Sequence, residues 1–375
     1  MSAPAYEVAI LEGDGIGSEV VRATEQVLAA ATRQADLDLT FVPLPVGLSA
    51  FEVHGSTLPT TTLDALQQIE AWLLGPVTHH IYDTTSGQMP NPSGTLRKRF
   101  ELYANERPAR TFPGVRAPFS DVDLVIVREN TEGFYADRNV LNGSSEMVIT
   151  PDVTVSLRVI TRQASTRVAE HAFALARQRS EHRHDGRPAR VTALHKANVL
   201  RRTDGLFLDS VRDVAARFPD VELDDLHADA FALHVLRDPG RFDVIVTTNL
   251  FGDVLSDLTA GMVGGLGLAP GLNVGSDHAM AQATHGSAPD IAGRGIANPV
   301  AEILSGAMLL AWLGRRHGDA RLAHCYDSIL RAVTAALADA SVRTPDLGGN
   351  GTTIGFTDAV IARLTTADHQ REGGS

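Results

Sequence analysis

The chain has 375 residues, enough at roughly 150 residues per domain for two domains or one large α/β unit with a sizeable core. Its 33 basic and 45 acidic residues give a net charge of −12 with no basic stripe, which argues against a sequence-independent nucleic-acid surface. The longest apolar run falls short of the ~20 residues of a membrane helix, no basic segment opens a secretory signal, and the single cysteine, Cys325, fits a reducing cytoplasm.

Short β-rich runs alternate with helical patterns along the chain, which is typical of α/β architecture. The predicted strands are residues 6–11, 39–42, 71–74, 122–128, 190–194 and 242–248. The predicted helices are residues 16–33, 61–68, 165–178, 203–217, 229–237, 299–316 and 320–340. Asn298 as N-cap and Pro299 at the first helical position mark the start of the sixth helix. Residues 147–160 are rich in β-branched side chains and predict an arm or an edge hairpin.

A glycine-rich segment, residues 12–17 (EGDGIG), follows the first predicted strand and opens the first predicted helix. Its glycines do not have the G-x-G-x-x-G spacing of a dinucleotide loop, and Glu19 adds a carboxylate that would repel a pyrophosphate. A structural turn is therefore favoured over a phosphate-binding loop.

Three arginines, Arg97, Arg107 and Arg128, are candidates for binding carboxylates. The first follows a loop rich in proline, and the third ends a predicted strand seven residues before Tyr135. An arginine can hold a carboxylate through two parallel hydrogen bonds, although for each of these residues alone a surface ion pair is the favoured explanation. The prediction depends on the fold assembling all three.

Asp253 and Asp257 are four residues apart, so on a helix their carboxylates share one face. Two adjacent carboxylates repel each other unless a cation lies between them, and hard oxygen ligands suit Mg²⁺ or Mn²⁺. The alternative is a solvated acidic face, but the flanking residues are apolar: Leu250, Phe251, Val254, Leu255 and Leu258.

Lys196 is one of only two lysines and follows the predicted strand 190–194. Functional groups of α/β sheets gather at the carboxyl ends of strands, and lysine, unlike arginine, can release a proton when its pKa falls. A structural lysine is the alternative. In the small-residue loop 285–293, Asp290 is suited to accept the hydroxyls of an adenosine ribose and to repel a 2′-phosphate, unless the loop only connects helices.

Together these motifs resemble the β-decarboxylating dehydrogenases, the isocitrate and 3-isopropylmalate dehydrogenase family. The segments that carry the resemblance span nearly the whole chain: GDGIGSE, LRKRFELYANERPAR, VRENTEGFY, HKANVL, DAFALH, NLFGDVLSD and HGSAPDIAGRGIANP. The resemblance implies the α/β fold of that family, which is not a Rossmann fold. It also implies a large cofactor-binding domain of residues 1–102 and 264–375 and a small domain of residues 103–263 with metal and catalytic residues and a dimer arm. The expected assembly is a homodimer, or a higher oligomer, with shared active sites.

The resemblance further implies roles for individual residues. The catalytic pair is Tyr135, which returns a proton to carbon, and Lys196, which comes from the neighbouring subunit and assists removal of the C2 hydroxyl proton. The substrate residues are Asn91, Ser93, Arg97, Arg107, Arg128 and Asn198. The ligands of Mg²⁺ or Mn²⁺ are Asp229 from the partner chain, Asp253 and Asp257. The residues for the cofactor, NAD rather than NADP, are His285, Gly286, Ser287, Ala288, Asp290 and Asn298.

The 3-substituent of the malate substrate is the least defined feature. Isopropylmalate enzymes have a glutamate and two leucines before the first arginine, where this chain has Pro90, Ser93 and Gly94. Isocitrate enzymes have a serine and an asparagine, and Asn91 and Ser93 are the same residue types exchanged. This predicts a polar substituent, as in isocitrate, homoisocitrate or a phosphonate analogue. Val199 still matches an isopropylmalate contact, so 3-isopropylmalate, D-malate and tartrate remain alternatives. A non-catalytic regulatory paralogue is disfavoured because the tyrosine, lysine and aspartates are all present.

Overall fold

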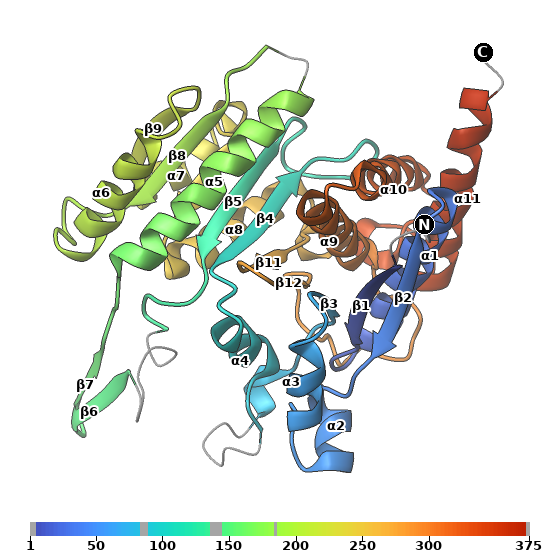
Figure 1. Cartoon of the computed structure of the whole chain (residues 1–375), viewed down its shortest axis with the longest axis horizontal. Coiled ribbons are helices and arrows are strands. Elements are labelled where there is room, and N and C mark those ends of the chain that lie inside the picture. Colours follow the sequence, from blue (N-terminus) through green and yellow to red (C-terminus); the bar gives the residue numbers. More distant parts are fainter. Residues whose placement is uncertain (1–4, 83–88, 136–144, 184–185, 373–375) are drawn as a thin grey trace.

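The computed structural model describes residues 5–82, 89–135, 145–183 and 186–372, and its centre is one ten-stranded sheet (Figure 1). The strands, in spatial order, are β2 (Asp38–Pro43), β1 (Ala5–Leu11), β3 (Ala71–Leu74), β12 (Ala279–Ala281), β11 (Leu272–Val274), β4 (Ala104–Arg110), β5 (Asp123–Glu129), β10 (Val244–Thr247), β8 (Arg190–His195) and β9 (Glu222–His227). Two parallel groups, β2-β1-β3-β12 and β5-β10-β8-β9, flank the antiparallel strands β11 and β4. The predicted α/β class is confirmed.

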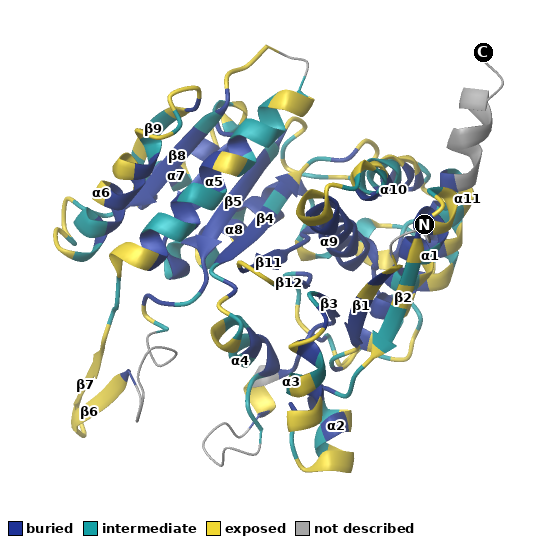
Figure 2. Ribbon diagram, in the orientation of Figure 1, coloured by how far each residue is buried: buried dark blue, intermediate teal, exposed yellow. Residues whose placement is uncertain are grey.

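Helices pack against both faces of each parallel group. The helices are α1 (Gly17–Gln34), α2 (Gly47–His54), α3 (Thr60–Leu66), α4 (Pro92–Arg99), α5 (Arg162–His182), α6 (Thr203–Ala215), α7 (Ala228–Val235), α8 (Asn249–Val263), α9 (Val300–His317), α10 (Ala320–Ala338) and α11 (Thr353–Glu372). Helices α1, α9, α10 and α11 share one apolar core with β1 and β3, whereas α5 and α6 share another with β5, β8 and β10. Helices α7 and α8 cover the opposite face of the second group. Helix α9 is buried on all sides from residue 300 to 314, so it forms the centre of the first core (Figure 2).

The six predicted strands and seven predicted helices are all present, with ends that shift by a few residues. Helix α9 begins at Val300, one residue later than predicted, because Pro299 is the N-cap residue while the Asn298 side chain accepts a hydrogen bond from the Val300 amide at 3.1 Å. Strands β4, β9, β11 and β12 were not predicted. Strand β4 reads ANERPAR, and its polar residues Asn105, Glu106 and Arg107 are buried because tertiary partners pair with them.

The sheet is continuous between the two predicted domains, since β11 of the large domain pairs with β4 of the small domain. The division into domains at residues 102 and 264 stays a prediction. Within the described part of the chain, no helix combines the length and apolar character that crossing a bilayer requires.

The predicted arm is a two-stranded antiparallel hairpin of β6 (Glu146–Thr150) and β7 (Val153–Ser156). It projects away from the body of the molecule, and every residue of both strands is exposed (Figures 1 and 2). A hairpin of two strands with no core of its own is at best marginally stable in water. The exposed apolar side chains therefore point to burial against another surface.

Candidate active site

A cleft with a volume of about 840 Å³ opens where the loop before α4, the strands β4 and β5, and the segment after β12 meet. The predicted site residues that line it are Asn91, Ser93, Arg97, Arg107, Arg128, Tyr135, Asp253, His285 and Gly286. The predicted residues outside its lining are Lys196, Asn198, Asp229, Asp257, Ser287, Ala288, Asp290 and Asn298. The fold thus brings all three predicted arginines to one cleft.

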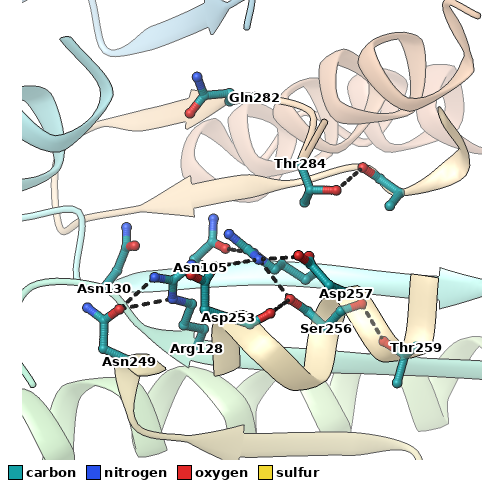
Figure 3. Close-up of polar contacts among 12 residues, drawn as sticks. Asn105, Arg128, Asn130, Asn249, Asp253, Ser256, Asp257, Thr259, Gln282 and Thr284 are labelled. Atoms are coloured by element: carbon teal, nitrogen blue, oxygen red, sulfur yellow. Dashed lines mark hydrogen bonds and ion pairs between the residues drawn. The ribbon is translucent and has the colours of Figure 1, made fainter. Parts of the chain in front are cut away.

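Asp253 pairs with both Arg107 and Arg128, and Figure 3 shows it beside Arg128. Its Oδ1 accepts a hydrogen bond from Arg107 Nη1 at 3.1 Å and another from Arg128 Nη1, and its Oδ2 accepts one from the Tyr135 hydroxyl at 3.2 Å. Helix α8 approaches β5 closely because position 252 is glycine, where an added Cβ would lie 2.6 Å from the Arg128 side chain. This close packing places the carboxylate against both guanidinium groups.

Three residues that the sequence did not single out hold the two arginines in place. Arg107 donates from Nε to Asn105 Oδ1 at 2.5 Å and from Nη1 to the Ser256 hydroxyl at 2.7 Å. Arg128 donates to Asn249 Oδ1 from Nη2 at 2.6 Å and from Nε at 3.1 Å (Figure 3). A sequence signal existed for Asn249 alone, which directly follows a predicted strand.

The close charges shift several pKa values. Burial and the neighbouring Arg128 together lower the pKa of Arg107 to about 10, against the opposing effect of Asp253 and Asp257. Burial would raise the pKa of Asp253, but Arg128 and Arg107 outweigh it and the net pKa is lowered. The pKa of Asp257 is raised, chiefly by burial, with Arg107 opposing and Asp253 adding to the shift. An anion that enters the cleft can therefore bind the arginines, and a cation can bind the aspartates.

Asp253 and Asp257 can supply part of a divalent-cation site. They project from the same face of α8, and Asp257 Oδ1 lies 3.8 Å from Arg107 Nη1 while its side chain is 59% exposed. Two neighbouring carboxylates are ligands that Mg²⁺ or Mn²⁺ prefers. Among the described residues, no group of three histidine, cysteine or acidic side chains converges to hold a metal. One chain therefore presents a partial site that fits the ion but does not complete it.

Lys196 and Asp229 form a second cluster away from this cleft. Lys196 follows β8, Asp229 lies in the first turn of α7, and their Nζ and Oδ1 atoms are 2.5 Å apart. The Lys196 side chain is 27% exposed and the Asp229 side chain 69%. Asn198, in the turn after Lys196, is exposed. These three predicted residues face solvent together, available to a second molecule.

The polar residues before Arg97 are already engaged within the chain. Asn91 Oδ1 accepts the Gly94 amide at 3.2 Å and caps α4. Gln282, which the sequence did not indicate, accepts hydrogen bonds at Oε1 from Ser93 Oγ at 2.8 Å and from Arg97 Nη2 at 3.2 Å. Gln282 follows the three-residue strand β12, which has no recognisable pattern. It lies across the cleft from Asp253 (Figure 3).

The loop after β12 carries the predicted cofactor residues. His285 Nδ1 lies 3.0 Å from the Gly286 carbonyl, so it carries the proton and leaves Nε2 as an acceptor. Nε2 is buried with no hydrogen-bond partner in the described structure, and burial lowers the pKa of the ring. An unpaired buried acceptor fits the amino group of an adenine. Asp290 is exposed, and Asn298 Nδ2 donates to Asp346 Oδ2 at 2.9 Å.

The turn of residues 13–17 supports this loop. Gly15 has a φ of +56°, and an added Cβ would lie 2.0 Å from the Ser287 carbonyl oxygen, which accepts the Ile16 amide at 2.9 Å. Thr78 Oγ1 donates to Ser287 Oγ at 2.6 Å. The buried Asp14 carboxylate accepts the Thr78 amide at 2.7 Å. These contacts fit the interpretation of the segment as a structural turn.

An α/β sheet with an arginine-rich cleft, adjacent carboxylates and a tyrosine is equipped for a small, multiply charged acid. The family model described as "Isocitrate/isopropylmalate dehydrogenase" matches residues 7–360 of this chain. The isocitrate/homoisocitrate dehydrogenase of Thermus thermophilus is 44% identical over 366 residues, 96% of this chain and 99% of that protein. The 3-isopropylmalate/3-methylmalate dehydrogenase of Methanocaldococcus jannaschii is 40% identical over 359 residues, with the same coverage of each chain.

Solved structures agree with this result. The isocitrate dehydrogenase from Methylococcus capsulatus superposes with a TM-score of 0.83 at 40% identity, covering 96% of this chain and 99% of that one. The chain belongs to the isocitrate/isopropylmalate dehydrogenase family. The resemblance predicted from the motifs is confirmed, and the residue roles stay predictions.

Proposed function

We propose that this protein catalyses the metal-dependent, NAD-linked oxidative decarboxylation of a (2R)-malate with a polar 3-substituent, of the isocitrate or homoisocitrate type or a phosphonate analogue. The observation that carries the proposal is the convergence of Arg97, Arg107 and Arg128 with Tyr135 and Asp253 on one cleft. Guanidinium groups that converge on one cleft can bind carboxylates and orient the substrate.

Two clusters carry out the two proton transfers: Tyr135 with Asp253 in the cleft, and Lys196 with Asp229. Tyr135 is held by its hydrogen bond to Asp253, and Arg128 lies 5.8 Å from the centre of its ring, where the cation stabilises the phenolate left after proton transfer to carbon. Lys196, which pairs with Asp229 in the free chain, must be a neutral amine at the moment of reaction, and in that form it assists removal of the C2 hydroxyl proton as hydride leaves. A bound divalent cation supplies Lewis-acid stabilisation of the charge that develops as carbon dioxide leaves.

The cofactor proposal rests on the loop after β12. The Nε2 acceptor of His285 suits adenine, and the exposed Asp290 carboxylate suits the two ribose hydroxyls of NAD and disfavours the phosphate of NADP. A relative named as an NAD-dependent isocitrate dehydrogenase catalytic subunit, from Arabidopsis thaliana, is 39% identical over 372 residues and 97% of this chain. NAD is bound as the hydride acceptor.

A homodimer with shared sites accounts for the separation of the two clusters. The Lys196–Asp229 pair faces solvent, whereas the cleft has carboxylates for only part of a metal site. In a dimer, Asp229 of one subunit joins Asp253 and Asp257 of the other, and the exposed arm contributes to the contact. The proposal includes the two-domain division at residues 102 and 264 and a cytoplasmic location.

The polar 3-substituent is argued from Ser93 and Gln282. Ser93 Oγ and Arg97 Nη2 both donate to Gln282 Oε1, so the wall of the cleft next to the arginine is lined by hydrogen-bonding groups. An isopropyl group there would displace water from this polar wall without offering a hydrogen bond in return, which is unfavourable. Val199 is 66% exposed beside the Lys196 cluster and is the one apolar contact that favours 3-isopropylmalate as an alternative.

The test is NADH formation at 340 nm with Mg²⁺ and with Mn²⁺. The substrates are isocitrate, homoisocitrate, 3-isopropylmalate, D-malate, tartrate and phosphonomethylmalate. We expect the highest kcat/KM for an acidic 3-substituent, no turnover after chelation by EDTA, and recovery when the metal is restored. Ser93→Leu should shift the preference toward 3-isopropylmalate. A wild-type preference for 3-isopropylmalate would contradict the polar wall, and no turnover of any malate would contradict the function.

A further inference from the structure

The segment of residues 158–161 joins the arm to α5 and contacts the loop that carries Tyr135. Val159 exchanges two backbone hydrogen bonds with Gly133, at 2.9 and 3.0 Å, two residues before that tyrosine. The Glu132 carboxylate accepts the Thr161 amide at 2.9 and 3.0 Å. The base of the arm and the tyrosine loop are therefore fastened together through the backbone.

Arg158 extends from this segment into the protein and is almost fully buried. Its Nη1 bonds Asp204 in an ion pair whose side chains are 8% and 0% exposed, and it also donates to Thr203 Oγ1 at 2.8 Å. Its Nη2 donates to Thr248 Oγ1 at 3.1 Å. The guanidinium lies 5.7 Å from the ring of Phe134. One side chain thus contacts the start of α6, the N-cap of α8 and the residue before Tyr135.

Asp204 connects Arg158 to Lys196. While Oδ1 of Asp204 pairs with Arg158, its Oδ2 accepts the backbone amide of Lys196 at 2.6 Å. The same turn is held by His195, whose Nδ1 accepts the Ala197 amide at 3.0 Å. The Asp204 carboxylate therefore fixes the backbone of Lys196. Arg158, at the base of the arm, in turn fixes that carboxylate.

A buried ion pair is expensive to desolvate, and an apolar pair of similar size often stabilises a fold at least as well. Stability alone is therefore a weak explanation for Arg158 and Asp204. What the pair provides is a rigid link, because the planar guanidinium holds several acceptors in one geometry. Each of its contacts lies next to a proposed catalytic or metal-binding element.

We propose that Arg158 and Asp204 are positioning residues that couple the arm to Lys196. When the arm packs on a second copy of the chain, Arg158 is held in place and Asp204 presents the lysine to the partner's cleft. This inference rests on the proposed function with its shared sites. Tyr135 depends less on the pair, since its loop is held by the backbone bonds of Val159, which side-chain substitutions leave in place.

The first test is the double variant Arg158→Met/Asp204→Asn. It removes both charges together, so no unpaired buried charge remains, and the asparagine introduced by the second substitution retains an oxygen for the Lys196 amide. We expect kcat to fall by about 10²-fold, the cost of a misplaced catalytic group, with the KM for substrate little changed and the melting temperature and dimer retained. The matched control is Arg162→Met/Asp213→Asn, an exposed pair at 3.1 Å with the same charges, which should leave kcat unchanged.

A purely structural role makes a different prediction. The double variant would then lose melting temperature while its folded fraction kept the wild-type kcat, and that result would overturn the inference. If the double variant fails to fold, Thr248→Val removes one hydrogen bond of the same arginine without disturbing a charge. It should lower kcat by a smaller factor at an unchanged melting temperature, and an unchanged kcat would count against the link.

The second test uses mixed dimers. A Tyr135→Phe chain paired with a Lys196→Met chain retains one competent site, which takes its lysine from the first chain and its tyrosine from the second. Placing Arg158→Met/Asp204→Asn on the first chain should lower the remaining activity by the same factor as in the homodimer. Placing it on the second chain should have a much smaller effect. Equal losses in both placements would contradict a role centred on the lysine.

These outcomes separate the inference from the proposed function. An inactive wild-type enzyme would reject the function itself, before any variant is made. An active wild type whose mixed dimers recover no activity would reject shared sites, and the coupling across the subunits with them. Active mixed dimers with the predicted asymmetry support both.

Discussion

At the scale of single residues, the cleft is organised by Asp253. Its carboxylate pairs with two nearly buried guanidinium groups, whose side chains are 10% exposed for Arg107 and 3% for Arg128. Asp257, one helical turn along, is more exposed and lies farther from Arg107. The two aspartates have the same proposed role toward a metal but different roles in the metal-free fold.

Substituting them should separate these roles. Asp253→Asn leaves two arginines facing each other and should lower the free energy of unfolding of the metal-free protein by about 1–3 kcal/mol, allowing for the partial exposure of this site. Asp257→Asn should be neutral or slightly stabilising, because the raised pKa of Asp257 shows that its carboxylate is disfavoured where it lies. Both variants should lose metal-dependent turnover. Urea titration with EDTA and NADH assays measure the two effects, and equal destabilisation would contradict this account.

A second carboxyl group, Glu302 in α9, is fully buried beneath the cofactor loop. Its Oε2 accepts the Ala283 amide at 2.8 Å, and its Oε1 has no hydrogen-bond partner among the described residues. Burial raises the pKa of Glu302 from 4.5 to about 8, against the opposing effect of the Ala283 hydrogen bond. The folded protein therefore holds this proton more tightly than the unfolded chain.

The sign of the pH dependence follows from that difference. The contribution of protonated Glu302 to the free energy of unfolding is complete below pH 4.5 and is lost as the pH rises toward about 8. At about 1.4 kcal/mol per pKa unit, the loss amounts to a few kcal/mol. Glu302→Gln stays neutral, so it should be more stable than the wild type at pH 9 and nearly equal at pH 5. Melting temperatures of the two proteins across this range test it. A constant difference between them would show that Glu302 does not titrate in this window.

At the scale of elements, the β6–β7 hairpin is the clearest case of a segment without a core. Val148 is 74% exposed and Ile149 58%, although both are strand residues with strong apolar character. The β-branched composition of the segment was enough to predict a hairpin, because strand propensity is local. Which surface covers it is not a local property, and the proposal assigns it to a second copy of the chain.

Val148→Lys should weaken self-association, because it places a charge within the proposed contact. We expect the dimer dissociation constant to rise by about tenfold or more, as for an interface residue of ordinary importance. Val53→Lys is the matched control: Val53 is 77% exposed at the end of α2, far from the arm. Sedimentation velocity over a range of concentrations compares them. If both variants behave as the wild type does, the arm does not contribute to the dimer.

At the scale of the whole molecule, two apolar cores are joined by one sheet through the antiparallel strands β11 and β4. Cys325 lies in the first core, on α10, and is 2% exposed. Burial raises the pKa of its thiol to about 11. Asp319 adds a smaller increase, and Arg321 opposes it. The only cysteine of the chain is thus a reporter of the opening of this core.

Reaction with Ellman's reagent at pH 7.5 should be more than about 10³-fold slower in the native protein than in 8 M urea, since only an opened core exposes the thiolate. The urea dependence of labelling should follow loss of the circular dichroism signal. The Arg162→Met/Asp213→Asn variant, altered only on the exposed surface around the second core, should label at the wild-type rate. Labelling of the native wild type at the rate of a free thiol would contradict the packing of α10.

The sequence by itself determined the α/β class, the order of most helices and strands, and the family, because strand and helix patterns are local and the motifs keep their spacing along the chain. Only the tertiary structure decided the surroundings of those motifs. The contacts of Gln282 and Glu302 could be identified only from the structure, in which β12 and α9 pack beside the cleft. The link from Arg158 through Asp204 to Lys196 likewise joins segments that are far apart in the chain. Such contacts depend on which distant groups folding brings together, and that information is not contained in the periodicity of any one segment.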